Sequence, residues 1–206
     1  MGGSGPVKPL TEFQKRLGRL LARNRSPDSY LAGGTGLHFL PTSTRYSNDL
    51  DFFHDSEERV ARAFAEDSAL MREEGLTVRI ELTQPGYIRA TVTDGVAATK
   101  VEWAHDSAWR FMPPLHLEEA GYILHPVDLA VTKVLVLAGR DEARDFLDVL
   151  YIEREILRLG ALVWAAVGKD PASHRSHCWS SSSDEVATTQ RISPASIWPP
   201  SRTCRN

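Results

Sequence analysis

Residues 48–53, with the sequence NDLDFF, carry the strongest structural signal in this chain. Polar and apolar residues alternate, which is typical of a strand with one buried face. Leu50 and Phe52 are expected to face a core, so that Asp49 and Asp51 project together from the opposite face. Two carboxylates so close repel each other unless a cation bridges them, and Mg²⁺ prefers such oxygen ligands. The stretch therefore predicts a strand with a magnesium site, although the polar face of an ordinary edge strand would show the same pattern.

A glycine turn precedes this strand. Residues 29–32, SYLA, predict a short strand, and a helix is expected to begin within residues 37–40, so that Gly33, Gly34 and Thr35 form the turn between them. Glycine lets backbone N–H groups approach a phosphate, and a helix N-terminus adds favourable partial charge. Thr35 can cap the helix or donate its hydroxyl to a phosphate. A Gly-Gly pair alone fits a plain turn, but followed by an acidic strand it predicts a nucleotide-binding site.

Two polar residues lie just before the acidic pair. Arg45 can clamp a phosphate, because its planar guanidinium matches phosphate geometry. Ser47 falls on the same strand face as Asp49, so its hydroxyl can contact a phosphate or a metal-bound water. Phosphorylation of Ser47 is a further hypothesis, since it would add charge there and block nucleotide binding.

These residues resemble a known family. GGTGL at residues 33–37, followed by RYSNDLDFF at 45–53, resembles the first motif of the AbiEii/AbiGii nucleotidyltransferase-like toxins, a group that includes the MenT-type toxins of toxin–antitoxin systems. KVE at 100–102, LAVTK at 129–133 and RDFLD at 144–148 resemble three later motifs in the same order. The resemblance extends over residues 28–168, and residue 102 is Glu where the family often has Asp.

The resemblance implies a minimal nucleotidyltransferase fold of the α+β class, in which helices flank a mixed or antiparallel sheet and a helical part follows. It implies Mg²⁺-dependent transfer of a nucleoside monophosphate from an NTP to a hydroxyl, with the metal bound by Asp49, Asp51 and Glu102. It further implies a toxin that acts on the acceptor end of tRNA and blocks translation, with a cognate antitoxin as partner. A small-molecule (antibiotic) nucleotidyltransferase and a non-catalytic binding module on the same fold are the alternatives.

A third acid is expected beside the acidic pair. Residues 76–82, 87–92 and 97–104 alternate between apolar and polar and are separated by turns, which predicts a meander of strands. In the last of them Glu102 lies on the face opposite Val101 and Trp103. Glu102 is either a metal ligand or base, or a surface residue paired with Lys100 or Arg89.

A buried helix is expected at residues 127–138, where Lys133 is the one cation among apolar residues. A buried lysine must reach the surface or meet an anion, such as a triphosphate or an active-site carboxylate. In the next expected helix, residues 142–159, Asp145 and Asp148 lie on one face. We expect Asp145 to position Lys133 or the acceptor hydroxyl and Asp148 to be structural; an Arg–Asp network between helices is the alternative.

A basic face is expected on the first helix, residues 10–24. The chain has a net charge of −3, and its tail carries four Arg against two acids, so residues 1–170 sum to −3 − 2 = −5. An acidic domain must meet RNA through a local basic patch. Arg16, Arg19 and Arg23 share a helix face and form such a candidate patch, or else an ordinary solvated face.

Composition divides the chain into four segments: a leader at 1–9, a nucleotidyltransferase core at 10–125, a helical segment at 126–170 that completes the site, and a tail at 171–206. The tail is rich in Ser and Pro and shows no period, which predicts disorder or an altered reading frame. No apolar run reaches membrane-spanning length. Both cysteines, Cys178 and Cys204, lie in the tail, which fits a cytoplasmic protein without a membrane partner.

Overall fold

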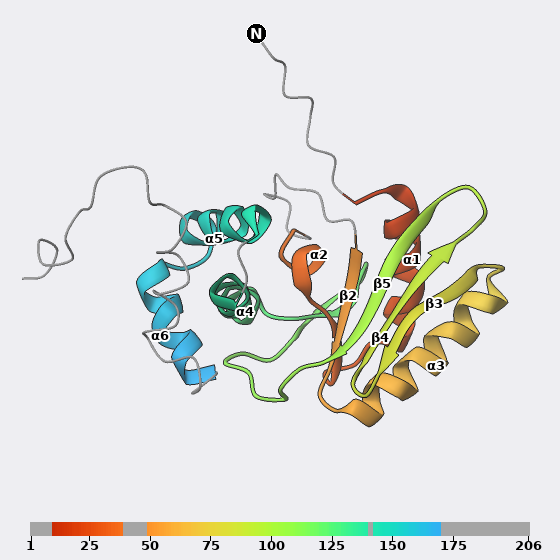
Figure 1. Ribbon diagram of the computed structural model, residues 1–206, viewed down its shortest axis with the longest axis horizontal. Helices are drawn as coiled ribbons and strands as arrows, with labels where there is room; N and C mark the ends of the chain where they lie inside the picture. The colour runs from red at the N-terminus through yellow and green to blue at the C-terminus, as the bar shows by residue number, and fades with distance from the viewer. Residues whose placement is uncertain (1–9, 39–48, 140–141, 170–206) are drawn as a thin grey trace, which may run out of the picture.

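The computed structural model describes residues 10–38, 49–139 and 142–169, and its centre is a seven-stranded sheet in the order β3-β4-β5-β2-β1-β7-β6 (Figure 1). The strands are β1 Ser29–Leu31, β2 Asp49–His54, β3 Thr77–Gln84, β4 Tyr87–Thr93, β5 Ala98–His105, β6 Leu115–Leu117 and β7 Gly121–Ile123. β2 is parallel to β5 and β1 is parallel to β7, whereas the other neighbouring pairs are antiparallel. The predicted mixed sheet and its meander are confirmed.

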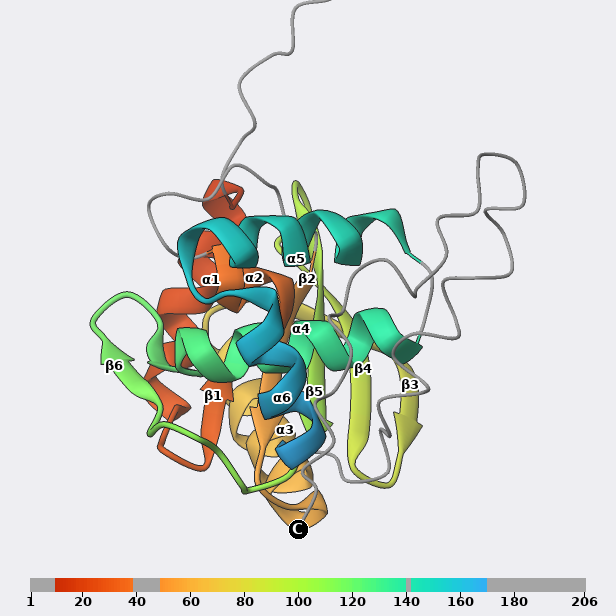
Figure 2. The ribbon, with the colours of Figure 1, turned by 90° about the vertical axis from the view of Figure 1, so that its left-hand side faces the viewer.

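Helices lie on both sides of this sheet. They are α1 Glu12–Leu21, continued by the 3-10 helix η1 Ala22–Asn24, then α2 Gly33–His38, α3 Glu57–Glu73, α4 Pro126–Gly139, α5 Ala143–Glu155 and α6 Leu159–Lys169. α1 and α3 cover one face, whereas α2 and a layer formed by α4, α5 and α6 lie on the other side (Figure 1). Figure 2 shows α6 lying across α4 and α5, with which it packs.

The main core lies between the sheet and the α1–α3 layer. It includes Leu50 and Phe52 of β2, which are 1 % exposed, and Val101 and Trp103 of β5, which are fully buried. Because side chains alternate along a strand, burial of these residues directs their neighbours to the opposite face. The alternation predicted for residues 48–53 is therefore confirmed over the residues that the structure describes, 49–53.

Two element boundaries differ from those expected. α2 begins at Gly33 rather than within residues 37–40, because the N–H of Gly36 already bonds to the carbonyl of Ala32 at 2.7 Å. β6 and β7 pair as a further hairpin. The helix expected over 142–159 ends at Glu155, and α6 follows after a short turn.

Some predictions fall outside the described residues. They concern the leader at 1–9, the tail at 171–206, and the phosphate contacts of Arg45 and Ser47. None of the described helices combines the length and the apolar character that crossing a membrane requires.

Candidate active site

Three carboxylates lie on neighbouring strands in the middle of the sheet. Asp51 of β2 pairs in register with Glu102 of β5, and Asp49 pairs with Lys100. The side chains of the three acids share the sheet face that turns away from the main core, because the residues that alternate with them along the strands are buried in that core. The structure thus brings together the three acids that were predicted to act as a group.

The electrostatics of Asp49 and Asp51 show how close these carboxylates are. Burial, and after it the negative charges of Glu102 and Asp49, raise the pKa of Asp51 to about 7, although Lys133 and a hydrogen bond from the Gly34 N–H act in the opposite direction. The pKa of Asp49 is also raised, first by burial and then by Glu102. A divalent cation between such groups would relieve their repulsion, which is the physical case for a metal here.

Glu102 is engaged by a neighbouring cation. The Nε of Arg89, on β4, donates to Oε1 of Glu102 at 2.8 Å, which is the ion pair that the sequence left open as an alternative. With the side chains in this arrangement, the described residues contain no group of three Asp, Glu, His or Cys side chains that could hold a metal. The oxygen ligands suit Mg²⁺, but Glu102 has to leave Arg89 to join them. The three-carboxylate metal site stays a prediction.

The glycine turn packs directly against the acidic strand. A Cβ at Gly33 would lie only 1.9 Å from Oδ2 of Asp51, so any side chain there would displace the carboxylate. The positive φ of Gly33 would be strained for another residue as well. Gly33 and Gly34 therefore bring bare backbone next to Asp51, as a phosphate-binding turn requires.

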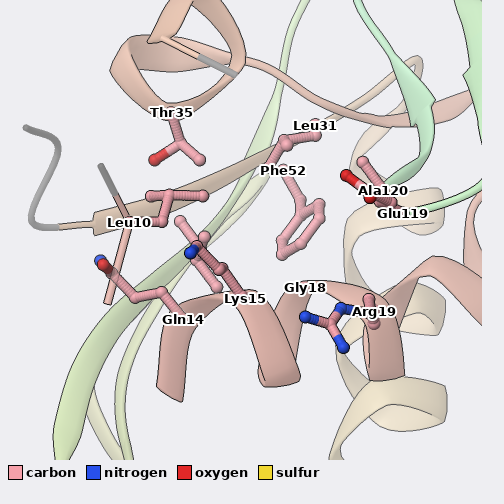
Figure 3. Close-up of a pocket in the computed structure, with 11 residues that line it drawn as sticks. Leu10, Gln14, Lys15, Gly18, Arg19, Leu31, Thr35, Phe52, Glu119 and Ala120 are labelled. Atoms are coloured by element: carbon pink, nitrogen blue, oxygen red, sulfur yellow. The ribbon is translucent and has the colours of Figure 1, made fainter. Parts of the chain in front are cut away.

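Thr35 is directed away from the acids. Its side chain is fully buried, and its hydroxyl donates to the backbone carbonyl of Asp49, so it fixes the start of β2. Figure 3 shows Thr35 at a cavity of about 300 Å³ between α1 and the core face of β2. The expected contact of the Thr35 hydroxyl with a phosphate gains no support from this position.

A cleft of about 430 Å³ opens between the acidic face of β2 and α4. Its lining residues come from both sides: Ala32, Gly33, Gly34, Asp51, Phe53 and Glu102 from the sheet and α2, and Leu124, Leu129, Thr132, Lys133, Val136 and Gly139 from α4 and the segment before it. The floor is acidic and the facing wall is mostly apolar. Such a mixture suits a ligand that carries both a charged and an aromatic part.

Lys133 meets carboxylates of the next helix. Its Nζ lies 2.8 Å from Oδ2 of Asp148 and 3.5 Å from Oδ1 of Asp145, and both acids are fully buried. Lys133 was expected to meet a triphosphate or a carboxylate, and the structure shows carboxylate partners. Asp148, which was expected to be purely structural, is the nearer of the two, because the i and i+3 positions of α5 place both side chains toward α4.

Lys169 was missed by sequence reasoning. Its ammonium, at the end of α6, lies 3.1 Å from Oγ1 of Thr132 and 3.3 Å from Oδ2 of Asp106, behind the wall of the cleft. The available signal was its position as the one cation of an apolar segment, residues 161–169. It is the same signal that singled out Lys133.

The basic face of α1 lies apart from the cleft. α1 packs on the other face of the sheet (Figure 1). Arg16 pairs with Asp94 at 2.7 Å, and Arg23 lies 3.7 Å from Glu74. Contact of RNA with Arg16, Arg19 and Arg23 therefore stays a prediction that the position of the acids does not favour.

Comparison with known proteins gives one family. Residues 17–194 match the family described as "Nucleotidyl transferase AbiEii toxin, Type IV TA system". The matched range passes residue 170, so the resemblance does not end where it was expected to end. No curated protein has a sequence that matches this chain significantly.

Two crystal structures from Helicobacter pylori have a similar fold. One is described as that of a putative nucleotidyltransferase from H. pylori; it has a TM-score of 0.54 and 17 % identity and covers 79 % of this chain and 83 % of its own. The other, JHP933, has a TM-score of 0.54 and 15 % identity and covers 79 % of this chain and 81 % of its own. At such identities the likeness shows the fold alone.

Proposed function

This chain belongs to the AbiEii family of nucleotidyl transferase toxins of type IV toxin–antitoxin systems, and on that premise we propose that it transfers a nucleoside monophosphate from an NTP to RNA, at the 3′ acceptor end of tRNA. The observation that carries the proposal is the group Asp49, Asp51 and Glu102 beside the bare backbone of Gly33 and Gly34. Blocked acceptor ends would stop translation in the cytoplasm, and a cognate antitoxin would counteract this.

The reaction makes one bond and breaks another. The acceptor hydroxyl oxygen bonds to the α-phosphorus, the bond from that phosphorus to the pyrophosphate oxygen breaks, and the hydroxyl proton passes to a base. A divalent cation bound by Asp49 and Asp51 would supply charge neutralisation for the phosphates and lower the pKa of the hydroxyl. Glu102, once released from Arg89, is the carboxylate available as third ligand or as base.

The remaining residues bind and orient the nucleotide. The backbone of Gly33 and Gly34, which lies beside Asp51, would hold the β- and γ-phosphates through its N–H groups, once the N–H of Gly34 is released from Asp51. Lys133 lines the opposite wall of the cleft and contributes positive charge there. Asp145 and Asp148 fix the position of its ammonium, so they act through Lys133 rather than on the substrate.

A labelled-NTP screen tests the proposal. Each of the four α-labelled NTPs is incubated with the protein and Mg²⁺, with either total tRNA or aminoglycosides as acceptor. We expect label at the 3′ end of tRNA, abolished by a chelator and reduced at least about 100-fold by Asp51→Ala, because a metal ligand contributes several kcal/mol to the transition state. Label on aminoglycosides alone, or no transfer with any acceptor, would overturn it.

A pair of glycine variants serves as a matched control in the same assay. Gly33→Ala places a methyl group against Asp51 and should abolish transfer. Gly18 lies in α1, and a methyl group there would have no atom within 4 Å other than those of its chain neighbours and its own helix backbone, so Gly18→Ala should leave transfer intact and stabilise the helix. Equal activity of the two variants would show that the turn does not bind the nucleotide.

A further inference from the structure

The described helices leave one face of the meander open. α3 packs against β3, β4 and β5 on the core side, and none of the described helices contacts β3 and β4 to a similar extent on the other side. Figure 1 shows the α4–α6 layer standing opposite α2 and β2 instead. The open face, which is defined here by Arg79, Tyr87, Arg89, Thr91 and Lys100, continues from the acidic group without interruption, since Arg89 and Lys100 pair in register with Glu102 and Asp49.

The strand order gives the reaction a direction. Gly33 follows β1, on one side of Asp51, whereas Glu102 lies on β5, on the other side. If the triphosphate lies over the glycine turn, as in the proposed function on which this inference rests, pyrophosphate leaves on the β1 side. Attacking and leaving oxygens lie roughly in line at the phosphorus. The acceptor hydroxyl must therefore approach from the β5 side, across the open face.

The side chains on this face suit a nucleic-acid strand. The side chain of Arg79 is 77 % exposed, and Lys100 is exposed and forms no ion pair with another described residue. The guanidinium of Arg89 lies 5.6 Å from the ring centre of Tyr87, so a cation and an aromatic ring stand side by side. Cations that track phosphates and rings that stack on bases are the two parts of a single-strand binding surface.

The acids of this face do not cancel its charge. Glu81 lies 3.7 Å from Arg79 and accepts a hydrogen bond from Thr91, and Glu102 is bound to Arg89. When Glu102 turns to a metal, Arg89 becomes available to a phosphate. Arg79, Arg89 and Lys100 then face the substrate, and Glu81 is the one acid that stays paired with any of them among the described residues.

We infer that the open face receives the single-stranded 3′ end of the acceptor RNA, with its backbone along Arg79, Arg89 and Lys100 and a base against Tyr87. This surface, rather than the arginine face of α1, joins the RNA to the reaction. It also explains how two substrates reach the same acids: the nucleotide occupies the cleft under α4, and the acceptor lies over β4 and β5.

The test compares charge reversals on the two faces. Variant one is Arg79→Glu/Lys100→Glu; the matched control is Arg16→Glu/Arg23→Glu, which also reverses two exposed cations, on α1. Affinity for a fluorescent tRNA acceptor-stem hairpin is measured by anisotropy at several salt concentrations, and KM is measured separately for RNA and NTP. We expect open-face reversal to weaken RNA binding and raise KM for RNA at least tenfold, with KM for NTP unchanged and the α1 control like wild type.

The salt dependence gives a second readout. Loss of two phosphate contacts should reduce the slope of log affinity against log salt by about 1.4, on the value for single strands. If the reversal variant fails to melt like wild type, Arg79→Gln/Lys100→Gln replaces it, with a smaller effect in the same direction. An unchanged KM for RNA in the open-face variant, or an equal loss of RNA affinity in the α1 control, would overturn the inference. The proposed function would still stand in either case, provided that the wild-type protein transfers label to RNA. Absence of transfer to RNA by wild type would overturn both.

Discussion

At the scale of single residues, Asp51 lies between a glycine backbone and a second carboxylate. Its pKa is raised from 3.8 to about 7, mainly by burial. Between these two values the folded protein keeps a proton that the unfolded chain releases, so the free energy of unfolding falls as pH rises through this window. The effect is at most about 4 kcal/mol for a displacement of this size.

This predicts a pH-dependent stability that one substitution removes. In a chelator, the melting temperature of wild type should fall from pH 5 to pH 8, whereas that of Asp51→Asn should change much less. Mg²⁺ at pH 8 should raise the melting temperature of wild type and not of Asp51→Asn. Parallel pH profiles of the two proteins, measured by calorimetry, would show that Asp51 is not the titrating group.

The alternation of polar and apolar residues predicted the orientation of some side chains of the site but not of others. Alternation was enough to place Asp49 and Asp51 on one face, because burial of Leu50 and Phe52 leaves no other choice. It was not enough for Thr35 or Glu102, whose orientation is set by the carbonyl of Asp49 and by Arg89. Those partners come from elements that only the tertiary fold brings together.

At the scale of elements, one lysine joins α4 to α5. Lys133 compensates the charge of Asp148 and Asp145, which are both fully buried. Removing one side of a buried ion pair leaves an uncompensated charge, which costs about 3–5 kcal/mol. Lys133→Ala should therefore lower the free energy of unfolding by that amount besides abolishing transfer.

Urea denaturation separates the two effects. Lys133→Met combined with Asp145→Asn and Asp148→Asn should recover most of the stability but none of the activity. Lys15→Ala is the control, because Lys15 forms an exposed pair with Glu12, and such pairs contribute about 1 kcal/mol or less. Full stability of Lys133→Ala would show that the two buried acids do not depend on this cation.

Long elements were predicted from their periodicity, whereas the β6–β7 hairpin was not predicted. α1 and the strands of the meander have enough residues for periodicity to fix their type and approximate ends. β6 and β7 have three residues each, so no period is detectable, and the hairpin depends on the φ of +70° at Gly121. A Cβ there would lie 2.7 Å from the carbonyl of Ala22, a contact that no local pattern reveals.

In the molecule as a whole, the sheet separates the face that carries the three acids from the face covered by α1 and α3. The order in which β2 lies between β5 and β1 joins distant segments of the chain. Periodicity predicted the strands and the β3-β4-β5 meander, but not the pairing of β1 with β7. The α1–α3 side contains its own buried ion pair. Asp67 of α3 accepts hydrogen bonds from Arg25 at 2.6 Å and from Nε1 of Trp103 at 2.7 Å, and both charged side chains are fully buried.

This separation predicts that a substitution on the α1–α3 side can lower the stability of the protein without changing its activity. Asp67→Asn leaves Arg25 buried without its counter-charge and should lower the free energy of unfolding by about 3–5 kcal/mol. Because Asp67 lies across the sheet from Asp51, transfer per folded molecule at low temperature should stay unchanged. The control Glu66→Gln changes the neighbouring, half-exposed acid and should alter stability little. Loss of transfer in folded Asp67→Asn would show that the two sides of the sheet are coupled. Trp103 would be the shortest path for such coupling, because it bonds to Asp67 and is the neighbour of Glu102 on β5.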